Sequence, residues 1–535
     1  MSETGSEERD SIRAAEMIAS LSLATDMGLG VELEHGLRSA IFAMRLAERL
    51  GVDRETAAQT YYVSLLVHIG CTANAHVAPD VFSEGADVLS RNLLPVLFGS
   101  QREMTGALLR TVAPGRSPAA RAVAIARTLP AAARAQGDIS SAAPRCEVAQ
   151  MLVQRLGLGT SLAQVFAHLQ ERWDGKGDPG RADGEQVHLA MRIAHVARDA
   201  DAQRALGGAE WAARVVRERA GRAFDPAIAT RLADDADEIL ALGDDEDAWQ
   251  HALDAEPAPH LMLDGEAIDR ALPAMGDFAD LASPYLAGHS AAVGRLVAQA
   301  ATRCRLQTGE VRALRRAAAV HDLGRVAVPV RIWQKPGPLT AGEWERVRLH
   351  AYHSERIICR SPFLAALAPV AATHHERLDG SGYHRGATAA TLTMAARMLA
   401  AADVYQAMIE PRPHRDAYAP EQAAELVSDE ARAGRLDPEA VAAVLDAAGQ
   451  PAARVERPAG LTDREAEVVG LLARGLQTKQ VARALGISAK TTDTHVQNAY
   501  RKIGVSTRAA ATLFAMENGL VASGEFPMVS SAART

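Results

Sequence analysis

The amino-acid sequence predicts an all-α protein, and three observations support this prediction. Almost every segment of the 535 residues repeats its apolar side chains at the helical spacing of three or four residues. The alternation of β-branched residues between paired turns that is typical of strands is nearly absent, and aromatic residues make up only 4% of the chain. The length exceeds what a single hydrophobic core supports, so we expect three or four helical domains.

The beginning of the chain is polar and acidic. Residues 1–12 are expected to be disordered, and amphipathic helices follow, among them residues 35–50, whose apolar side chains share one face. The first residues lack the basic segment and apolar core of a secretion signal, and no run of eighteen apolar residues occurs. The sequence therefore predicts a cytoplasmic protein that does not contact a membrane.

Two long stretches of the chain repeat each other's motifs. An offset of 254 residues places His35 on His289 and residues 67–70 (VHIG) on residues 321–324 (HDLG). Further on, residues 171–177 (ERWDGKG) match residues 376–382 (ERLDGSG) at an offset of 205, so the first copy carries about fifty extra residues, expected between Asp80 and Pro144. We expect related helical domains over residues 13–243 and 262–448, with linkers at 244–261 and 449–460.

The second copy concentrates potential metal ligands. Five histidines and two aspartates without a cysteine form an N/O donor set, which suits iron, manganese or zinc held for chemistry. Adjacent residues on a helix diverge by roughly 100°, so a His-Asp or His-His pair can serve two metals, and two metals can activate a water for phosphoryl displacement. The sequence thus predicts a two-metal hydrolytic centre formed by His289, His321, Asp322, His350, His374, His375 and Asp403.

These ligands, with the segments HDLGR (321–325), KPG (335–337) and HHERLDGSGY (374–383), resemble the HD-GYP branch of the HD phosphohydrolases. The resemblance implies an all-helical domain with two or three metals, usually iron or manganese, and hydrolysis of cyclic di-GMP as the best-known activity. It also implies Asp322 as the bridge between the metals. By position, Asp322, Arg325 and Lys335 are the implied catalytic residues, and the implied phosphate contacts are Arg325, Lys335, Arg377 and Arg385.

Three positions depart from the HD-GYP pattern. The lysine that follows HD-x-G is Arg325, which grips phosphate but cannot donate a proton near neutrality. The proline of GYP is His384, so the loop loses a fixed φ and gains a titratable group. Three-metal members carry a glutamate where this chain has Tyr285, and its replacement by tyrosine favours two metals. Metal binding tolerates these changes better than substrate identity does.

The first copy lacks the ligand set. Valine and leucine cannot bind a metal, and two arginines would repel one, so we expect a catalytically inactive domain that serves as a regulatory pocket, as a pseudo-dimer partner, or as both. The residues at the seven ligand positions are His35, Val67, His68, Arg145, Leu169, Gln170 and Arg198.

The end of the chain is locally basic. Residues 461–521 contain eight Lys or Arg and five Asp or Glu, whereas the whole chain has a formal charge of −8. Thr462 and Glu465 form a capping box ahead of a helix over 465–473, Thr478 is the expected cap of a helix over 479–485, and Ser488 caps a third helix to about residue 502. This arrangement predicts a helix-turn-helix, with a plain helical hairpin as the alternative.

The segments LTDREAEV (461–468), LGIS (485–488) and RKIGV (501–505) resemble the LuxR/NarL DNA-binding domain over residues 461–523, with a tail at 524–535. The resemblance implies binding of double-stranded DNA as a homodimer. Its base-facing positions fall on Asp493, Thr494 and Gln497, and Asp493 replaces a common lysine. The implied phosphate contacts are Lys479, Ser488, Lys490, Thr491, Arg501 and Lys502.

Three functions fit this organisation. The first is a transcriptional regulator whose second HD-GYP-like domain holds two divalent metals and hydrolyses a cyclic dinucleotide such as cyclic di-GMP. The second is a regulator that binds a nucleotide or metal without turnover, and the third is a hydrolase of another phosphate ester. Metal content and a product assay distinguish the three.

Overall fold

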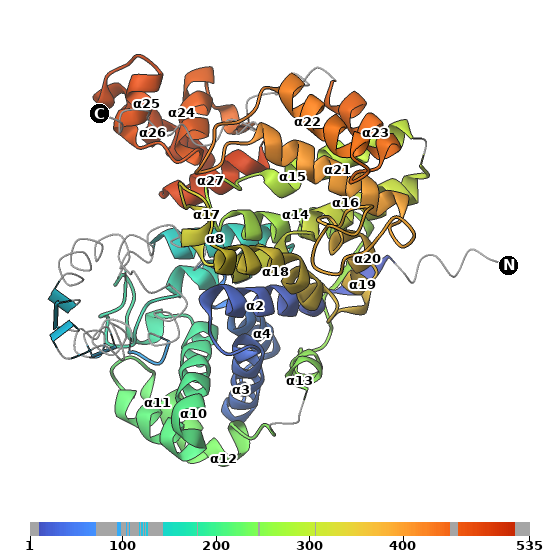
Figure 1. The fold of residues 1–535 in the computed structure, drawn as a ribbon. Helices are drawn as coiled ribbons and strands as arrows, with labels where there is room; N and C mark the ends of the chain where they lie inside the picture. Colours follow the sequence, from blue (N-terminus) through green and yellow to red (C-terminus); the bar gives the residue numbers. More distant parts are fainter. Residues whose placement is uncertain are drawn as a thin grey trace. The chain divides into compact units, whose positions relative to one another are not determined.

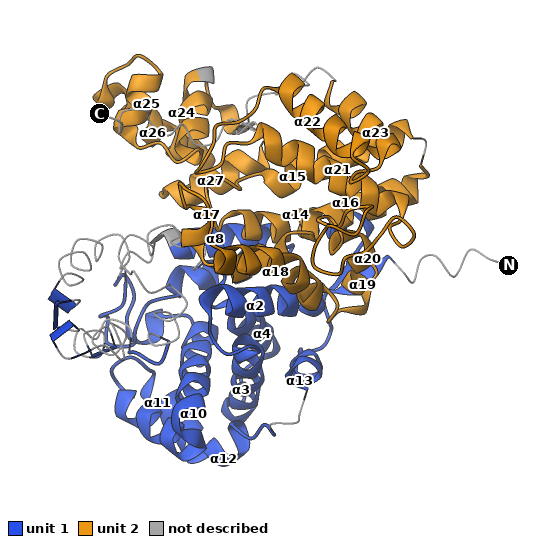
Figure 2. Cartoon of the chain, in the orientation of Figure 1, with its two compact units in different colours: residues 1–268 blue, residues 269–535 orange. Residues whose placement is uncertain are grey.

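Helices dominate the computed structural model, which confirms the all-α prediction (Figure 1). The structure describes residues 10–70, 94–97, separate positions between 103 and 126, 143–178, 180–243, 247–304, 306–449, 458–518 and 520. Two short strands, β1 (Ser11–Arg13) and β2 (Met262–Asp264), form an antiparallel pair with Ile12 opposite Leu263. No helix among the described residues is long and apolar enough to cross a bilayer. The chain divides into two compact units, residues 1–268 and 269–535 (Figure 2).

The first unit is built around α3, which packs against α4 and α10. α3 begins and ends at the residues expected from its apolar face. α10 is broken at Gly207 and Gly208, because Gly208 has φ 81, a left-handed conformation that glycine adopts without strain. The helices are α2 (Ala14–Leu29), α3 (His35–Leu50), α4 (Arg54–Leu66), α8 (Ala143–Arg155), α9 (Thr160–Val165), η3 (Phe166–His168), η4 (Gly184–Gln186), α10 (Leu189–Arg219), α11 (Pro226–Asp234), α12 (Ala236–Ile239) and α13 (Ala248–Asp254).

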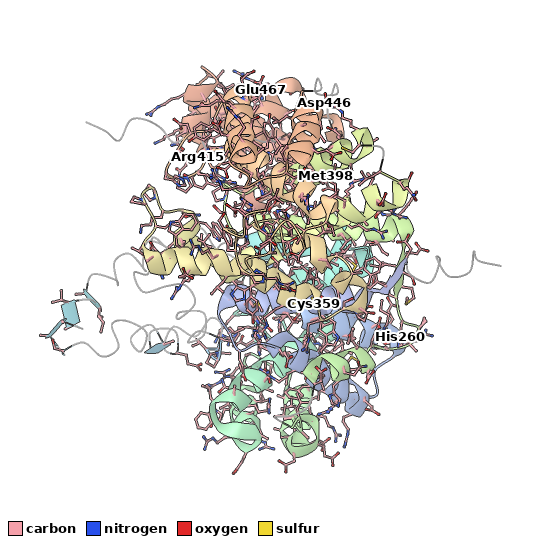
Figure 3. The ribbon with its side chains drawn as sticks, turned by 45° about the vertical axis from the view of Figure 1, so that its right-hand side comes forward. His260, Cys359, Met398, Arg415, Asp446 and Glu467 are labelled. Carbon is pink, nitrogen blue, oxygen red and sulfur yellow. The ribbon has the colours of Figure 1, made fainter. Side chains whose placement is uncertain are left out.

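The second unit is centred on α15, which packs against α16, α21 and α23. Alanine, valine and leucine side chains fill this core, and Met398 of α21 is fully buried within it (Figure 3). α14 begins in the first unit and ends in the second. The helices are α14 (Gly265–Asp280), α15 (His289–Arg303), α16 (Thr308–Val320), η5 (Leu323–Ala327), α17 (Val330–Trp333), α18 (Ala341–Ile358), α19 (Pro362–Ala365), α20 (Ala368–Ala371), α21 (Met394–Ile409), α22 (Pro420–Arg432) and α23 (Pro438–Ala448).

The C-terminal module follows η6 (Pro458–Gly460) and contains α24 (Asp463–Ala473), α25 (Thr478–Ala484), α26 (Ala489–Ile503) and α27 (Arg508–Glu517). The predicted capping box of Thr462 and Glu465 is present, and the Ser488 hydroxyl accepts a hydrogen bond from the Thr491 N–H. The prediction that Thr478 caps α25 is wrong. Gln477 takes that role, because its side chain and that of Gln480 form a second capping box one residue earlier.

The module shares a hydrophobic cluster with the segment that precedes α15. Leu281 and Ala287 pack with side chains of α24 and α27, and Met516 reaches the backbone at Gly288. Gly288 adopts φ 79 and caps α15, whose first residue is His289. The module therefore contacts the loop that carries the first predicted metal ligand.

The two sequence offsets recur in the structure. α3 and α15 begin 254 residues apart, as do α4 and α16, and α10 and α21 begin 205 residues apart. A Cβ on Gly70 would lie 2.1 Å from the Arg145 carbonyl oxygen, and a Cβ on Gly324 would lie 2.1 Å from that of His350. Both pairs are related by the same offsets. Common descent of the two copies stays a prediction.

In one close contact between two helices, the glycine and the serine exchange places between the two copies. A Cβ on Gly36 of α3 would lie 2.0 Å from Ser22 Oγ of α2. At the positions 254 residues later, a Cβ on Gly276 of α14 would lie 3.0 Å from Ser290 Cβ of α15. Each pair of helices thus packs closely through one glycine and one serine, in opposite order.

Candidate metal centre

All seven predicted metal ligands lie in the second unit and converge on one centre. His289 begins α15, His350 lies in α18, and Asp403 lies in α21. The expectation that the His-Asp and His-His pairs lie within helices is wrong. His321 is the C-cap of α16, and His374 follows the end of α20, so each pair sits in a turn that points its side chains inward.

The ligands form two groups with one carboxylate between them. His289, His321, Asp322 and Asp403 make the first group, and three histidines, His350, His374 and His375, make the second; the ligand atoms of each group lie within 4.8 Å of one another.

Each oxygen of Asp322 faces a different group. Its Oδ2 lies 2.9 Å from His321 Nε2 and 3.6 Å from His289 Nε2. Its Oδ1 lies 3.3 Å from the Nε2 atoms of both His350 and His374. This is the geometry that a carboxylate needs to join two metal positions.

Backbone carbonyls orient three of the imidazoles. The Nδ1 atoms of His321, His350 and His374 donate to the carbonyl oxygens of Ala318, Val347 and Ala371, at 2.7, 2.5 and 2.7 Å. Because the proton is held on Nδ1, the Nε2 lone pair is directed into the centre. These carbonyls, each three residues before its histidine, thus select the tautomer that binds a metal.

Glu410 performs the same role for His289, and the sequence reasoning missed it. Its Oε2 accepts from His289 Nδ1 at 2.9 Å, and Gln406 donates to its other oxygen at 2.8 Å. Glu410 follows α21 seven residues after Asp403, a helical spacing that places both side chains on one face. That spacing was the available signal.

The charge states of Asp322, His374 and His375 suit ligation. Burial would raise the pKa of Asp322, but the guanidinium of Arg325 and the imidazole of His321 hold that pKa well below its usual range. Burial lowers the pKa of His374 to about 4, and burial together with His374 lowers that of His375. His374 and His375 therefore offer neutral imidazoles, the form that binds a metal.

The centre also contains unsatisfied polar atoms. His321 Nε2 and both oxygens of Asp322 are buried, and none has a hydrogen bond of acceptable geometry to any described residue. Buried polar atoms normally have a partner, so these three atoms indicate that a further group binds at the centre. Converging nitrogen and oxygen donors fit a pair of divalent cations, with iron or manganese as the expected ions and zinc as the alternative.

Arg325 lies inside the centre. Its side chain is almost fully buried, with Nη1 2.8 Å from Asp322 Oδ2 and Nη2 3.5 Å from His289 Nε2. The Trp333 ring packs against the guanidinium at 5.7 Å. The arginine that replaces the usual lysine thus binds the bridging carboxylate itself.

The other predicted phosphate contacts are engaged with residues of the second unit. Lys335 pairs with Glu343 at 2.6 Å, and Arg385 pairs with Glu355. Arg377 donates to the backbone carbonyl of Glu376 at 2.8 Å and acts electrostatically on His375. Lys335 and Arg385 must leave a carboxylate partner before they bind a phosphate.

Aromatic rings mark the open side of the centre. The His375 side chain is 15% exposed, the most among the seven ligands, and Tyr383 stacks on it with ring centroids 4.6 Å apart. His384, which replaces the GYP proline, lies 3.3 Å from Glu355. A ligand that reaches the second group therefore meets Tyr383.

The nine predicted DNA contacts are all exposed on the C-terminal module. Three also support the local fold: Ser488 caps α26, Lys502 pairs with Glu465 at 2.6 Å, and Arg501 donates to Asn498 at 2.8 Å. The remaining six have side chains on the outer surface: Lys479, Lys490, Thr491, Asp493, Thr494 and Gln497.

Comparison with known proteins matches both parts of the second unit. Residues 273–440 match the HD domain model, and residues 459–515 match the model of bacterial regulatory proteins of the luxR family. The "3'3'-cGAMP-specific phosphodiesterase 3" of Vibrio cholerae is 28% identical over 451 residues, which cover 81% of this chain and 94% of that protein. The "Cyclic di-GMP phosphodiesterase" of Thermotoga maritima is 37% identical over 160 residues, 29% of this chain and 43% of that protein.

A solved structure extends the likeness to the fold. The crystal structure of a cyclic GMP-AMP specific phosphodiesterase of V. cholerae aligns with a TM-score of 0.55 and 25% identity, and the alignment covers 83% of this chain and 99% of that one. The chain therefore carries an HD domain followed by a C-terminal LuxR-type helix-turn-helix domain, and its relatives are cyclic dinucleotide phosphodiesterases.

Proposed function

We propose that the second unit is a two-metal phosphodiesterase for a cyclic dinucleotide and that the C-terminal module links it to transcription. The observation that carries the proposal is the position of Asp322, whose two oxygens face two separate groups of ligands. The names of the relatives, which act on 3'3'-cGAMP or cyclic di-GMP, support the substrate class.

The seven side chains would hold two divalent cations, which supply Lewis-acid activation of water and of the phosphodiester when they are bound. Arg325 neutralises charge on Asp322 and presents a permanent cation to a phosphate. Arg377, beside His375, adds a second cation at the open side. The protein's own residues thus position a phosphate and balance its charge.

Tyr383 supports a nucleotide rather than a simple phosphate ester. Its ring stands at the open side of the second group, stacked on His375. Aromatic side chains bind nucleobases by stacking, at about 1–3 kcal/mol per base. A base held there would bring its phosphate towards the two groups.

The hydrophobic cluster of Leu281 and Ala287 with the C-terminal module supports coupling of the two activities. Leu281 and Ala287 lie shortly before His289 in the chain, so a movement of His289 would also move the surface against which α27 packs. Ligand binding at the centre would thereby bias the presentation of α26 to DNA, by a homodimer as in LuxR-type regulators.

The first test measures metal content and turnover on the same anaerobically purified protein. We expect about two metals per chain and hydrolysis of cyclic di-GMP or 3'3'-cGAMP. Asp322→Ala should lose both, because it removes the carboxylate between the groups. Asp429→Ala, at an exposed position of α22, is the matched control and should keep both. A metal-free wild-type protein would refute the proposal.

A second candidate function is nucleotide sensing without turnover, and the Arg325–Asp322 contact favours it. A guanidinium 2.8 Å from the bridging carboxylate competes with a divalent cation for that oxygen. This function predicts nucleotide binding without product, whereas turnover of a different phosphate ester by the metal-loaded protein would indicate the third function.

A further inference from the structure

The first unit has a polar cavity that the repeat of the metal ligands does not explain. The cavity measures about 510 Å³ and lies between the beginning of α4, α9, η3 and the residue that precedes α10. Sites that bind small molecules have volumes of roughly 300–1,000 Å³. The described residues that line the cavity are all polar, and none of them is a lysine or an arginine.

Two histidines of this cavity are fixed hydrogen-bond donors. His168 Nδ1 accepts from the backbone N–H of His188 at 3.0 Å, and His188 Nδ1 accepts from that of Ala190 at 3.3 Å. Burial lowers the pKa of both imidazoles, so both are neutral at neutral pH. A neutral imidazole whose Nδ1 accepts a hydrogen bond carries its proton on Nε2. Each ring therefore offers an Nε2–H group, and no described residue accepts from it.

A carboxylate lines the same cavity. Glu55 Oε1 accepts from Gln59 Nε2 and from Ser161 Oγ, each at the long distance of 3.4 Å. No described residue donates to Glu55 Oε2. The amide of Gln164 also lines the cavity and has no hydrogen bond to a described residue. The cavity thus combines two N–H donors with a carboxylate acceptor that has capacity for further hydrogen bonds.

This set of side chains suits neither a metal nor a phosphate. The carboxylates and imidazoles of the cavity are absent from the described groups whose ligand atoms lie within 4.8 Å of one another. A protonated Nε2 has no lone pair for a cation. A phosphate would meet the carboxylates of Asp53 and Glu55 without a cationic side chain among the described lining residues. A neutral polar ligand with both acceptors and donors fits instead.

A guanine base has this combination on its edges. Its O6 and N7 atoms accept hydrogen bonds, which matches the Nε2–H groups of His168 and His188. Its N1–H and N2 amino groups donate in parallel, which matches the two oxygens of the Glu55 carboxylate. Adenine has an amino group in place of O6 and no amino group at C2. It would therefore leave the carboxylate without its pair of donors.

The second unit keeps the helices but not these side chains. α16 and α21 begin at the positions that match α4 and α10. The residues that match Glu55, His168 and His188 at the offsets of 254 and 205 are Gly309, Thr373 and Thr393. Helices of this arrangement therefore form without a carboxylate or an imidazole at these positions, which indicates a role other than folding for the three side chains in the first unit.

We propose that the cavity formed by Glu55, His168 and His188 binds a guanine base, with the carboxylate reading the N1–H and N2 amino groups and the imidazoles reading O6 and N7. The ribose and any phosphate of the ligand would lie outside the carboxylates, towards solvent. The site is separate from the metal centre, and it gives the first unit a ligand of its own.

The first test is calorimetric titration of the full-length chain with guanosine and, separately, with adenosine. Guanosine should bind saturably at a site that adenosine occupies about tenfold or more weakly, because adenine cannot pair with the carboxylate. Absence of saturable guanosine binding would overturn the proposal, and so would equal affinities for the two nucleosides. This comparison uses the wild-type protein, so it does not depend on the folding of a variant.

Two substitutions place the guanosine site. Glu55→Gln keeps the size of the side chain and should weaken guanosine binding about tenfold or more, because an amide has a single acceptor oxygen. Glu218→Gln removes a charge from an exposed position of α10 and should leave the affinity unchanged. The unfolding midpoint of each variant without ligand should equal that of the wild type. Equal guanosine affinities of the two variants would refute the assignment to this cavity.

Discussion

At the scale of single residues, Glu410 shows that a metal ligand depends on a side chain that is not itself a ligand. Glu410 is not a member of the first group, yet it holds the proton on His289 Nδ1 and leaves Nε2 facing Asp403 at 3.0 Å. Outer partners of this kind raise ligand basicity and fix ring orientation. The affinity of the first group for a metal therefore depends on a side chain outside the group.

Glu410→Gln should lower metal affinity about tenfold or more, because an amide is a weaker acceptor for the imidazole proton. Anaerobic competition with a chromophoric chelator measures this change. Glu421→Gln, an exposed position in the first turn of α22, is the control. Equal affinities of the two variants would show that Glu410 does not orient the ligand.

Residue types and spacing were enough to predict all seven side chains that converge on the centre. Arg325 was also identified, but its contact with Asp322 was not foreseen, since a pairing between neighbours depends on the turn of η5. Glu410 was missed because its role requires the packing of α15 on α21. What a side chain touches across the core cannot be read from local spacing alone.

At the scale of elements, the centre depends on how closely α18 approaches η5. Gly324 allows this approach, since a Cβ there would lie 2.1 Å from the His350 carbonyl oxygen and 2.4 Å from Ser354 N. Both contacts are to backbone atoms of α18, which cannot move aside without moving the helix. The position of His350 is thus set by a glycine in another element.

Gly324→Ala should displace α18 and remove the metal held by the group of His350, so metal content should fall by about half, given a two-metal centre. Elemental analysis of the purified protein measures this loss. Gly342→Ala is the control, because Gly342 lies in α18 and a Cβ there would meet no other atom within 4 Å. A full complement of metal in Gly324→Ala would contradict this account.

Helix identity was easier to predict than helix ends. The bounds of α3 follow from its apolar face. In contrast, α16 ends at Val320 and α20 has only four residues, so the two ligand pairs lie outside the helices in which they were expected. The Gln477 cap likewise replaced the expected Thr478, since a glutamine capping box is a weaker sequence signal than threonine. Each of these differences between prediction and structure lies at a helix end, where neighbouring residues compete to end or cap the helix.

At the scale of the whole molecule, the second unit combines an HD domain with a DNA-binding module. The motifs of both were evident in the sequence, because ligands and helix caps are local features. The relation of the first unit to the second rests on recurring offsets and glycine contacts, and it stays a prediction. The homodimer also stays a prediction.

Lys490→Ala should weaken DNA binding about equally for all sequences and reduce the slope of log affinity against log salt by about 1, because one phosphate contact is lost. Fluorescence anisotropy with a mixed-sequence duplex at several salt concentrations measures both quantities. Lys176→Ala, an exposed lysine of the first unit, is the control. An unchanged slope in Lys490→Ala would remove this residue from the interface.

The opposite order of glycine and serine in the two helix pairs constrains the history of the chain. If the pairs Ser22–Gly36 and Gly276–Ser290 descend from one ancestral pair, two substitutions separate them. Serine at both positions would bring a Cβ within 2.0 Å of the Ser22 hydroxyl in the first copy, whereas glycine at both positions places no side chain in this contact. Under such descent, the path that avoids this clash passes through a glycine–glycine intermediate, in which one helix loses its serine before the facing helix gains one.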